Sequence, residues 1–337
     1  MKILKNAIEA AKDYDTLFID VYGVLFNGVG LFDRVPETLQ ELHKQGKKIV
    51  ILSNTTQLSS DAISGYSERG MVQGVHYDYF MTSGEFLRHI LLNDKQFIEK
   101  QIGHELNTYK CLFMSNSNIF DGTSVTKAEQ YSDADVIYLA PVRASYGGIR
   151  VDCLRDADGN DVSIDTFIYE DWTKLYDDKG QQGLAEIHFC LEKLASMNKP
   201  ILLANPDIFA NSSIDGKRYP LLCQGGVGAY YEHRFGGKVV RIGKPYPEIF
   251  EFAKTATNSS GKILMFGDTL WTDVLGAQLS GIDSALVRTG ITEIFTKDMA
   301  QATDDEKIEH LINTGNQISG MKNAAPTFLL DQFARGA

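Results

Sequence analysis

A short apolar run that ends in an aspartate constrains the fold more than any other feature of this chain. The run Thr16–Ile19 has the apolar, strand-forming character of a buried β-strand, and Asp20 follows it directly, before a turn at Gly23. In an open α/β sheet, a carboxylate at the carboxyl end of a strand faces the crevice in which such sheets bind ligands. Taken alone, Asp20 is equally well explained as a residue that caps the next turn.

Two further strand-like runs also end in polar groups. Ser53 and Asn54 follow the run 49–52, and hydroxyl, amide and backbone N–H groups at such a terminus can donate to phosphate oxygens, although Ser and Asn are also ordinary helix caps. Lys244 lies between a glycine and a proline after the run 238–240. Most lysines are solvated surface charges, so this lysine gains meaning only beside the other motifs.

The run 263–267 leads into two aspartates, Asp268 and Asp273, which are five positions apart. Paired carboxylates at a strand end suit Mg²⁺, which prefers one or two carboxylates together with water and substrate oxygens. Each aspartate alone could be a turn residue or a helix cap. As a set, the four segments supply what an aspartyl nucleophile acting on phosphate requires.

The order of these motifs resembles that of the haloacid dehalogenase (HAD) superfamily and, within it, subfamily IIA. The matching segments are Gly243-Lys244-Pro245, the run 267–277 and Asn205-Pro206-Asp207. The resemblance covers the chain from Tyr14 to about Val287, and it implies a Rossmann-like, doubly wound parallel α/β core with an inserted α/β cap domain of the C2 type. We expect the core at residues 1–82 and 207–337 and the cap at 83–206.

Hydrophobic periodicity predicts further elements. These are a helix over 35–43 with Leu39 and Leu42 on one face, a helix from near Ser83, strands at 111–114, 136–139 and 201–204, and a helix within 185–197.

The resemblance also implies a mechanism. The carboxylate of Asp20 would attack phosphorus and form an aspartyl-phosphate, which water then hydrolyses. Two anions ~4 Å apart repel by about 4 kcal/mol at an effective dielectric near 20, and a shared Mg²⁺ ion would offset this repulsion. The implied metal ligands are Asp20, the backbone carbonyl of Tyr22, Asp268 and Asp273. The implied phosphate-binding groups are Ser53, Asn54 and Lys244. Asn205 and Asp207 would position the substrate or the cap hinge, although an Asn-Pro-Asp sequence also forms turns.

One position departs from the HAD phosphatase pattern. These enzymes usually carry a second aspartate two residues after the nucleophile, which protonates the leaving oxygen, and here that residue is Tyr22. A phenol with an ordinary pKa of about 10 is protonated at neutral pH but is poorly matched to general acid–base catalysis. The adjacent residues Val21, Gly23 and Val24 offer no carboxylate in its place.

Three readings of this departure compete. The first, which we favour, is a phosphatase limited to leaving groups that need little protonation, such as acyl phosphates, anhydrides or aryl phosphates. The second is a catalytically impaired protein that keeps the phosphate pocket for binding or regulation. The third is a 2-haloacid dehalogenase, because the Asp-x-Tyr-Gly start resembles those enzymes; they need no metal, so the Asp268/Asp273 pair and the large cap count against it.

Composition limits the partners. The chain has 337 residues, enough for two domains, and is 43% hydrophobic and 23% charged, as ordinary globular proteins are. Its formal net charge of −11 argues against nucleic acid or an anionic membrane surface as partner. Four scattered cysteines and the absence of a signal-like N-terminus favour a reducing cytoplasm. No apolar run approaches the ~20 residues of a membrane span.

A large cap favours a small phosphorylated metabolite as substrate over a phosphoprotein. The relatives that the resemblance brings in act on pyridoxal phosphate, phosphoglycolate and nucleotides. Their caps often take part in dimer contacts, so a homodimer is a candidate assembly, and the sequence leaves the oligomeric state open. Candidate substrate contacts in the cap are Arg143, Tyr146, Arg150, Trp172 and Lys174.

Overall fold

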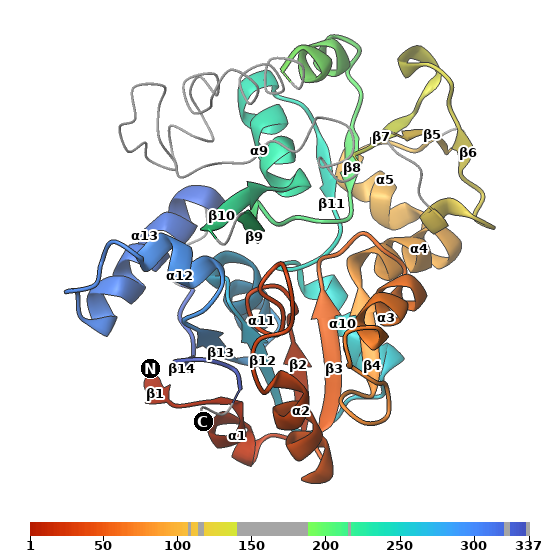
Figure 1. Ribbon diagram of the computed structural model, residues 1–337. Helices are drawn as coiled ribbons and strands as arrows, with labels where there is room; N and C mark the ends of the chain where they lie inside the picture. Colours follow the sequence, from red (N-terminus) through yellow and green to blue (C-terminus); the bar gives the residue numbers. More distant parts are fainter. Residues whose placement is uncertain (107–108, 114–117, 140–187, 215–216, 320–323, 335–337) are drawn as a thin grey trace.

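The structure, a computed structural model, describes residues 1–106, 109–113, 118–139, 188–214, 217–319 and 324–334. The five candidate cap contacts Arg143, Tyr146, Arg150, Trp172 and Lys174 lie outside these ranges. Within them, the chain forms two parallel sheets, one above the other in Figure 1.

The larger sheet has seven strands, all parallel, and forms the core. In spatial order they are β1 (Lys2–Leu4), β14 (Phe328–Leu330), β13 (Asp283–Val287), β12 (Ile263–Gly267), β2 (Thr16–Ile19), β3 (Lys48–Ser53) and β4 (Tyr79–Thr82). The helices in the described ranges include α1 (Ala7–Ala10), α2 (Val35–Lys44), α3 (Ser59–Ser67), α4 (Ser83–Asn93), α5 (Gln96–Ile102), α9 (Gln224–Phe235), α10 (Pro247–Ala256), α11 (Leu275–Leu279), α12 (Ile291–Thr296) and α13 (Asp304–Ser319), and residues 188–196 are also helical.

Side chains of the central strands alternate between two hydrophobic clusters, one on each face of the core sheet. In β2, Leu17 and Ile19 join one cluster and Phe18 joins the other, and all three are fully buried. Residues of α1, α2 and α3 complete the first cluster, and residues of α4, α10 and α11 complete the second. Strands buried on both faces read as continuous apolar runs, which is why the sequence predicted them. The doubly wound α/β core is confirmed.

The predicted local elements are also found. The helix expected over 35–43 is α2, with Leu39 and Leu42 fully buried, and α4 begins at Ser83. Of the helical pattern predicted within 185–197, the structure describes the residues from 188 onward, and residues 188–196 are helical. No helix in the described ranges is long and apolar enough to cross a membrane.

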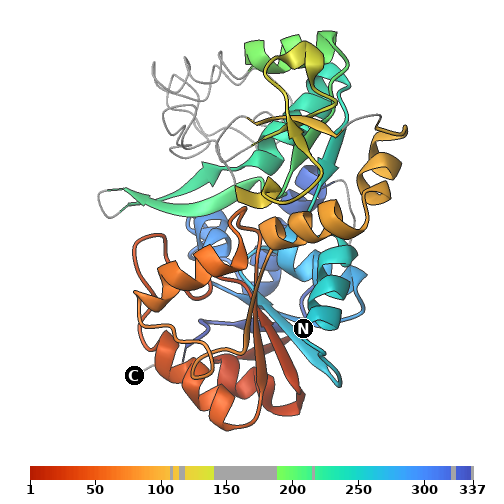
Figure 2. The same ribbon diagram turned by 90° about the vertical axis from the view of Figure 1, so that its right-hand side faces the viewer.

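The smaller sheet forms the cap. Its five parallel strands lie in the order β11 (Val239–Arg241), β8 (Ile201–Leu203), β7 (Val136–Tyr138), β5 (Lys110–Phe113) and β6 (Thr126–Lys127). An antiparallel hairpin of β9 (Phe209–Ile214) and β10 (Lys217–Leu222) extends between cap and core, as Figure 2 shows. The ring of Phe209 at its base lies 6.0 Å from that of Phe295 in α12, between ring centroids.

The cap extends beyond residue 206, where the sequence predicted its end. Strand β11 pairs with β8, so strands on both sides of the predicted boundary belong to the cap sheet. The cap therefore extends to Arg241, and the chain re-enters the core at Lys244 and α10. A buried parallel strand has the same apolar appearance in either sheet, and only the pairing reveals which one it joins.

The place of β11 can be tested by truncating its buried side chain. Val240→Ala should lower the free energy of unfolding by about 2 kcal/mol, because Val240 is fully buried in the second hydrophobic cluster, together with residues of both sheets. Val29→Ala is the matched control, since Val29 is 71% exposed. Urea unfolding followed by circular dichroism measures both variants. Equal stabilities would contradict the placement of β11 in a packed sheet.

Candidate active site

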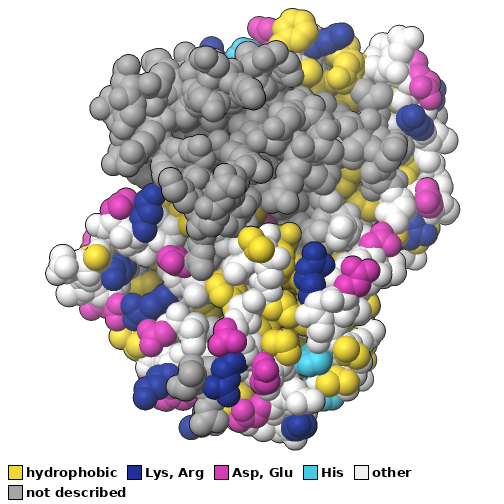
Figure 3. All heavy atoms as spheres, viewed as in Figure 1, with side chains coloured by type: hydrophobic (Ala, Val, Ile, Leu, Met, Phe, Trp, Pro, Cys, Tyr) yellow, Lys and Arg dark blue, Asp and Glu magenta, His cyan; other side chains and the backbone are white. Residues whose placement is uncertain are grey.

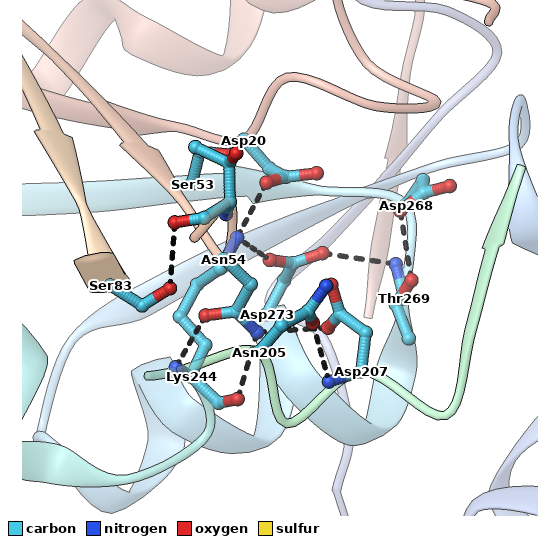
Figure 4. Close-up of polar contacts among 11 residues, drawn as sticks. Asp20, Ser53, Asn54, Ser83, Asn205, Asp207, Lys244, Asp268, Thr269 and Asp273 are labelled. Atoms are coloured by element: carbon cyan, nitrogen blue, oxygen red, sulfur yellow. Dashed lines mark hydrogen bonds and ion pairs between the residues drawn. The ribbon is translucent and has the colours of Figure 1, made fainter. Parts of the chain in front are cut away.

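Three neighbouring strands of the core sheet end at one edge, and each carries a polar residue there. Asp20 follows β2, Ser53 ends β3, and Asp268 follows β12. The strand order β12-β2-β3 places these ends side by side. The predicted convergence of the strand-end residues is therefore present, and Figure 4 shows their side chains around a common centre.

Lys244 reaches this centre from the opposite side, just beyond the last cap strand. Its ammonium Nζ donates to Asp20 Oδ1 at 2.6 Å and to Asp273 Oδ1 at 2.7 Å. The lysine is only 1% exposed, so both ion pairs are shielded from water. A buried lysine requires such compensation, because an isolated buried charge is strongly destabilising.

The two predicted carboxylates after β12 are held by local hydrogen bonds. Asp273 lies in a π-helical turn, Leu270–Val274, and its Oδ2 accepts from the N–H of Thr269 at 3.2 Å. Asp268 accepts from Thr269 Oγ1 at 2.8 Å and from the N–H of Ile291 at 2.7 Å. These contacts orient both carboxylates before any ligand binds.

Burial shifts the titration of the cluster. It raises the pKa of Asp20 to about 7, with help from the charges of Asp273 and Asp207 and against the effect of Lys244. Burial, together with the charges of Asp273 and Asp20, raises the pKa of Asp268 well above its ordinary value. For Lys244, burial alone would lower the pKa, but the carboxylates of Asp20, Asp273 and Asp207 raise it, so the lysine stays charged.

The cluster has the donors of a hard-cation site. One oxygen each from Asp20, Asp268 and Asp273 lie within 4.8 Å of one another, and all three residues are buried. The carboxylates of Asp20, Asp273 and Asp207 act on the ammonium of Lys244, and Asp268 adds a fourth carboxylate to the cluster. The excess of negative charge and the all-oxygen donor set fit Mg²⁺ or a similar divalent ion.

Asn54 is placed differently from its predicted role. Its side-chain Oδ1 accepts from the N–H of Lys244 at 2.7 Å, and its Nδ2 donates to the carbonyl of Lys244 at 3.0 Å and to Asp207 Oδ1 at 2.8 Å. The amide thus has protein partners at both ends. The backbone of Asp207 is held by Asn205, whose Oδ1 accepts a hydrogen bond from the N–H of Asp207 at 3.0 Å.

Tyr22 lies at the margin of the cluster. Its half-buried ring packs edge-on against Phe26, with ring centroids 5.3 Å apart. Phe26 continues the contact to Tyr66 of α3, at 6.1 Å. Burial raises the pKa of Tyr66 above its ordinary value, and the charges of Tyr22 and Asp20 add to this effect. The phenol of Tyr66 therefore lies close enough to Asp20 for the two groups to interact electrostatically.

Two groups in the site were missed from the sequence. Ser83 follows β4, and its Oγ donates to the carbonyl of Thr55 at 3.0 Å and also contacts the carbonyl of Ala204. The strand-end rule that found Asp20 would have found Ser83 as well. The other group is Tyr66, which lies in the last turn of α3 and has no comparable signal.

Close approach of the backbone to Asp268 requires glycine at position 290. Gly290 has φ +67°, and a Cβ there would lie 2.0 Å from Asp268 Oδ2. Gly290→Ala should therefore displace the carboxylate, destabilise the fold and weaken Mg²⁺ binding by the cluster. Gly281→Ala is the matched control, because Gly281 has φ +65° but its Cβ would meet nothing within 4 Å.

Both variants carry the left-handed strain of about 1–2 kcal/mol. Urea unfolding and calorimetric Mg²⁺ titration should show a clearly larger loss for Gly290→Ala. If the two variants lost the same stability and bound Mg²⁺ alike, the contact with Asp268 would have no consequence.

Solved structures share this fold. A hydrolase of the haloacid dehalogenase-like family from Brucella suis 1330 has a TM-score of 0.65 at 21% identity, over 98% of this chain and 100% of that one. A "possible sugar phosphatase" of the HAD superfamily from Cytophaga hutchinsonii has a TM-score of 0.64 at 17% identity, over 100% of both chains. A glycerol phosphate phosphatase from Mycobacterium tuberculosis, in complex with calcium, has a TM-score of 0.52 at 19% identity, over 86% of this chain and 70% of that one. At these identities the likeness shows the fold.

Sequence comparison gives the family. No curated protein matches the chain. The family model described as haloacid dehalogenase-like hydrolase matches residues 17–119, and a second, HAD-hydrolase-like model matches residues 241–314. The two matches hold the strand-end motifs on both sides of the cap, including Asp20, Lys244 and Asp268. The chain belongs to the haloacid dehalogenase-like hydrolases.

Proposed function

We propose that the chain is a Mg²⁺-dependent phosphatase of subfamily IIA that forms an aspartyl-phosphate on Asp20. The observation that carries this proposal is the ion-paired cluster at the carboxyl edge of the core sheet. Asp20 is held 2.6 Å from Lys244, and its carboxylate shares a site with Asp268 and Asp273. Phosphatase-named structural neighbours support the reaction class.

In this proposal Asp20 is the nucleophile. Its carboxylate attacks phosphorus, the bond to the leaving oxygen breaks, and water later cleaves the acyl phosphate to release inorganic phosphate and restore Asp20. Lys244 and Ser53 hold the transferring oxygens, whose negative charge catalysis must stabilise. Because the amide of Asn54 is engaged by protein partners, we assign it to holding Lys244 rather than to a side-chain contact with phosphate.

Asp20, Asp268 and Asp273, with the carbonyl of Tyr22, would hold the Mg²⁺ ion. When bound, the ion supplies positive charge that offsets the repulsion between the Asp20 carboxylate and the phosphate. The structure of the mycobacterial neighbour contains a divalent ion, calcium. The buried excess of carboxylates in the present chain supports a need for the same kind of charge.

The substrate that fits best is a small phosphorylated metabolite, because the cap sheet and its hairpin stand over the carboxyl edge of the core. On the face shown in Figure 3, Lys and Arg side chains are interspersed with Asp and Glu, which suits a small ligand better than nucleic acid. The four cysteines are scattered through the sequence with no CxxC spacing, which supports a reducing, cytoplasmic location. A homodimer and the absence of a membrane partner stay predictions.

Tyr22 favours one alternative, a protein that binds a phosphorylated ligand with little turnover, since its ring packs on Phe26 and supplies no carboxyl group. The hypothesis of a 2-haloacid dehalogenase has less support than the other two, because a halide leaving group needs neither the Asp268/Asp273 pair nor a metal.

The first test is hydrolysis of nitrophenyl phosphate by wild type and Asp20→Asn, each with Mg²⁺ and with EDTA. Wild type should be active only with Mg²⁺, and Asp20→Asn should lose at least ~10³-fold because the amide is not a nucleophile. Circular dichroism must show both proteins folded. If both proteins hydrolysed the substrate at the same measurable rate, the role of Asp20 as nucleophile would be refuted. If neither protein were active, the result would favour the alternative, a protein that binds a phosphorylated ligand.

The second test addresses the leaving group. Tyr22→Asp should raise kcat/KM for alkyl phosphates by ~10-fold or more while changing aryl phosphates little, because only poor leaving groups need a proton. Tyr22→Phe is the matched control, since it keeps the ring on Phe26 and removes only the hydroxyl. A selective loss with Tyr22→Phe on alkyl substrates would instead identify the phenol as the proton donor.

A further inference from the structure

Two neighbouring cap strands end beside the active site and carry one polar residue each. β8 and β11 are parallel, with Leu203 opposite Arg241, and the N–H of Ile242 donates to the carbonyl of Leu203 at 3.0 Å. Beyond these ends, the first strand leads to Asp207 and the second to Lys244. The cap sheet therefore delivers both residues to the same place.

Asn54, from the core, lies between them. Its amide makes two hydrogen bonds with the backbone of Lys244, one to the N–H and one to the carbonyl, and a third with the carboxylate of Asp207. Asn54 is only 3% exposed, so water does not compete for these contacts. Gly243 allows the close packing, because a Cβ there would lie 2.6 Å from Asn54 Oδ1 and 2.7 Å from the ring of Pro206.

Asp207 reinforces the orientation of the Asn54 amide that the backbone of Lys244 also requires. A carboxylate only accepts hydrogen bonds, so it selects the NH₂ end of the amide and directs the oxygen to the N–H of Lys244. A charged acceptor makes this bond roughly twice as strong as a neutral one. Burial raises the pKa of Asp207 to about 6, so the carboxylate is mostly ionised at neutral pH.

We propose that Asp207 is a positioning residue: by holding the amide of the core residue Asn54 against the backbone of Lys244, it braces the active-site lysine against the core. The brace matters because the backbone of Lys244 follows a cap strand while its ammonium lies between two core carboxylates, Asp20 and Asp273. Without the brace, a displacement of the cap would move the lysine. The inference rests on the proposed function only in that Lys244 is taken to hold the transferring phosphate.

Three variants test this role. Asp207→Ala removes the acceptor, and Asp207→Asn keeps an oxygen that can accept from Asn54 but lacks the charge. Asp61→Ala is the matched control, because Asp61 Oδ2 accepts from Asn118 Nδ2 at 2.8 Å in another aspartate–asparagine contact between α3 and the cap, exposed and not connected to Lys244. The readouts are kcat and KM for nitrophenyl phosphate and an alkyl phosphate, and amide hydrogen exchange of the segment 242–244.

Asp207→Ala should lower kcat by ~10²-fold for both substrates, because misplacement of a catalytic group by about 1 Å has an effect of this size, and should speed exchange at 242–244. Asp207→Asn should fall between Asp207→Ala and wild type in both readouts, and Asp61→Ala should match wild type. Wild-type exchange and turnover in Asp207→Ala would overturn the proposal. So would a loss in Asp207→Asn confined to the alkyl phosphate, which would make Asp207 a proton donor.

The exchange measurement separates this inference from the proposed function. If wild type shows no turnover that depends on Asp20, the phosphatase proposal fails, and faster exchange at 242–244 in Asp207→Ala alone still supports the brace. If wild type is active and the Asp207 variants leave both readouts unchanged, only the brace fails.

Discussion

The ammonium of Lys244 between Asp20 and Asp273 is the interaction on which the rest of the structure depends. Taking three charges out of water is costly, and only close pairing with further hydrogen bonds compensates for it. Both core carboxylates are therefore fixed relative to a residue whose backbone leaves the cap. The buried ammonium of Lys244 thus helps to hold the end of the cap against the core. Loss of this contact would affect both the stability of the fold and the chemistry of the site.

The two parallel sheets explain why the site lies where it does. In each sheet the strands run in one direction, so their carboxyl ends share an edge. The core edge supplies Asp20, Ser53 and Asp268, and the cap strands β8 and β11 supply Asp207 and Lys244. Because Lys244 is ion-paired with Asp20 and Asp207 is hydrogen-bonded to the core residue Asn54, the carboxyl edges of both sheets meet at the site (Figures 1 and 4).

Local rules predicted the parts of this arrangement that depend on single strands. Continuous apolar runs predicted the strands that are buried on both faces. The polar residues after these runs predicted that Asp20, Ser53 and Asp268 lie in one site. The same rules could not assign β11 to the cap, since its pattern fits either sheet. Nor could they give the role of Asn54, because a sequence shows that an amide has donors and an acceptor but not which partners fill them. Those outcomes depend on tertiary pairing.

Tyr22 becomes understandable from the charge of the site. The site already holds four carboxylates, those of Asp20, Asp268, Asp273 and Asp207, and an aspartate at position 22 would add a fifth near Asp20. The phenol avoids that repulsion, and its ring gains packing against Phe26, over which the guanidinium of Arg69 lies at 5.6 Å. In the proposed phosphatase, the group given up is a carboxylic acid beside the leaving oxygen. Such an enzyme would keep the groups that bind phosphate, and its turnover would depend on how readily the leaving group departs without a proton.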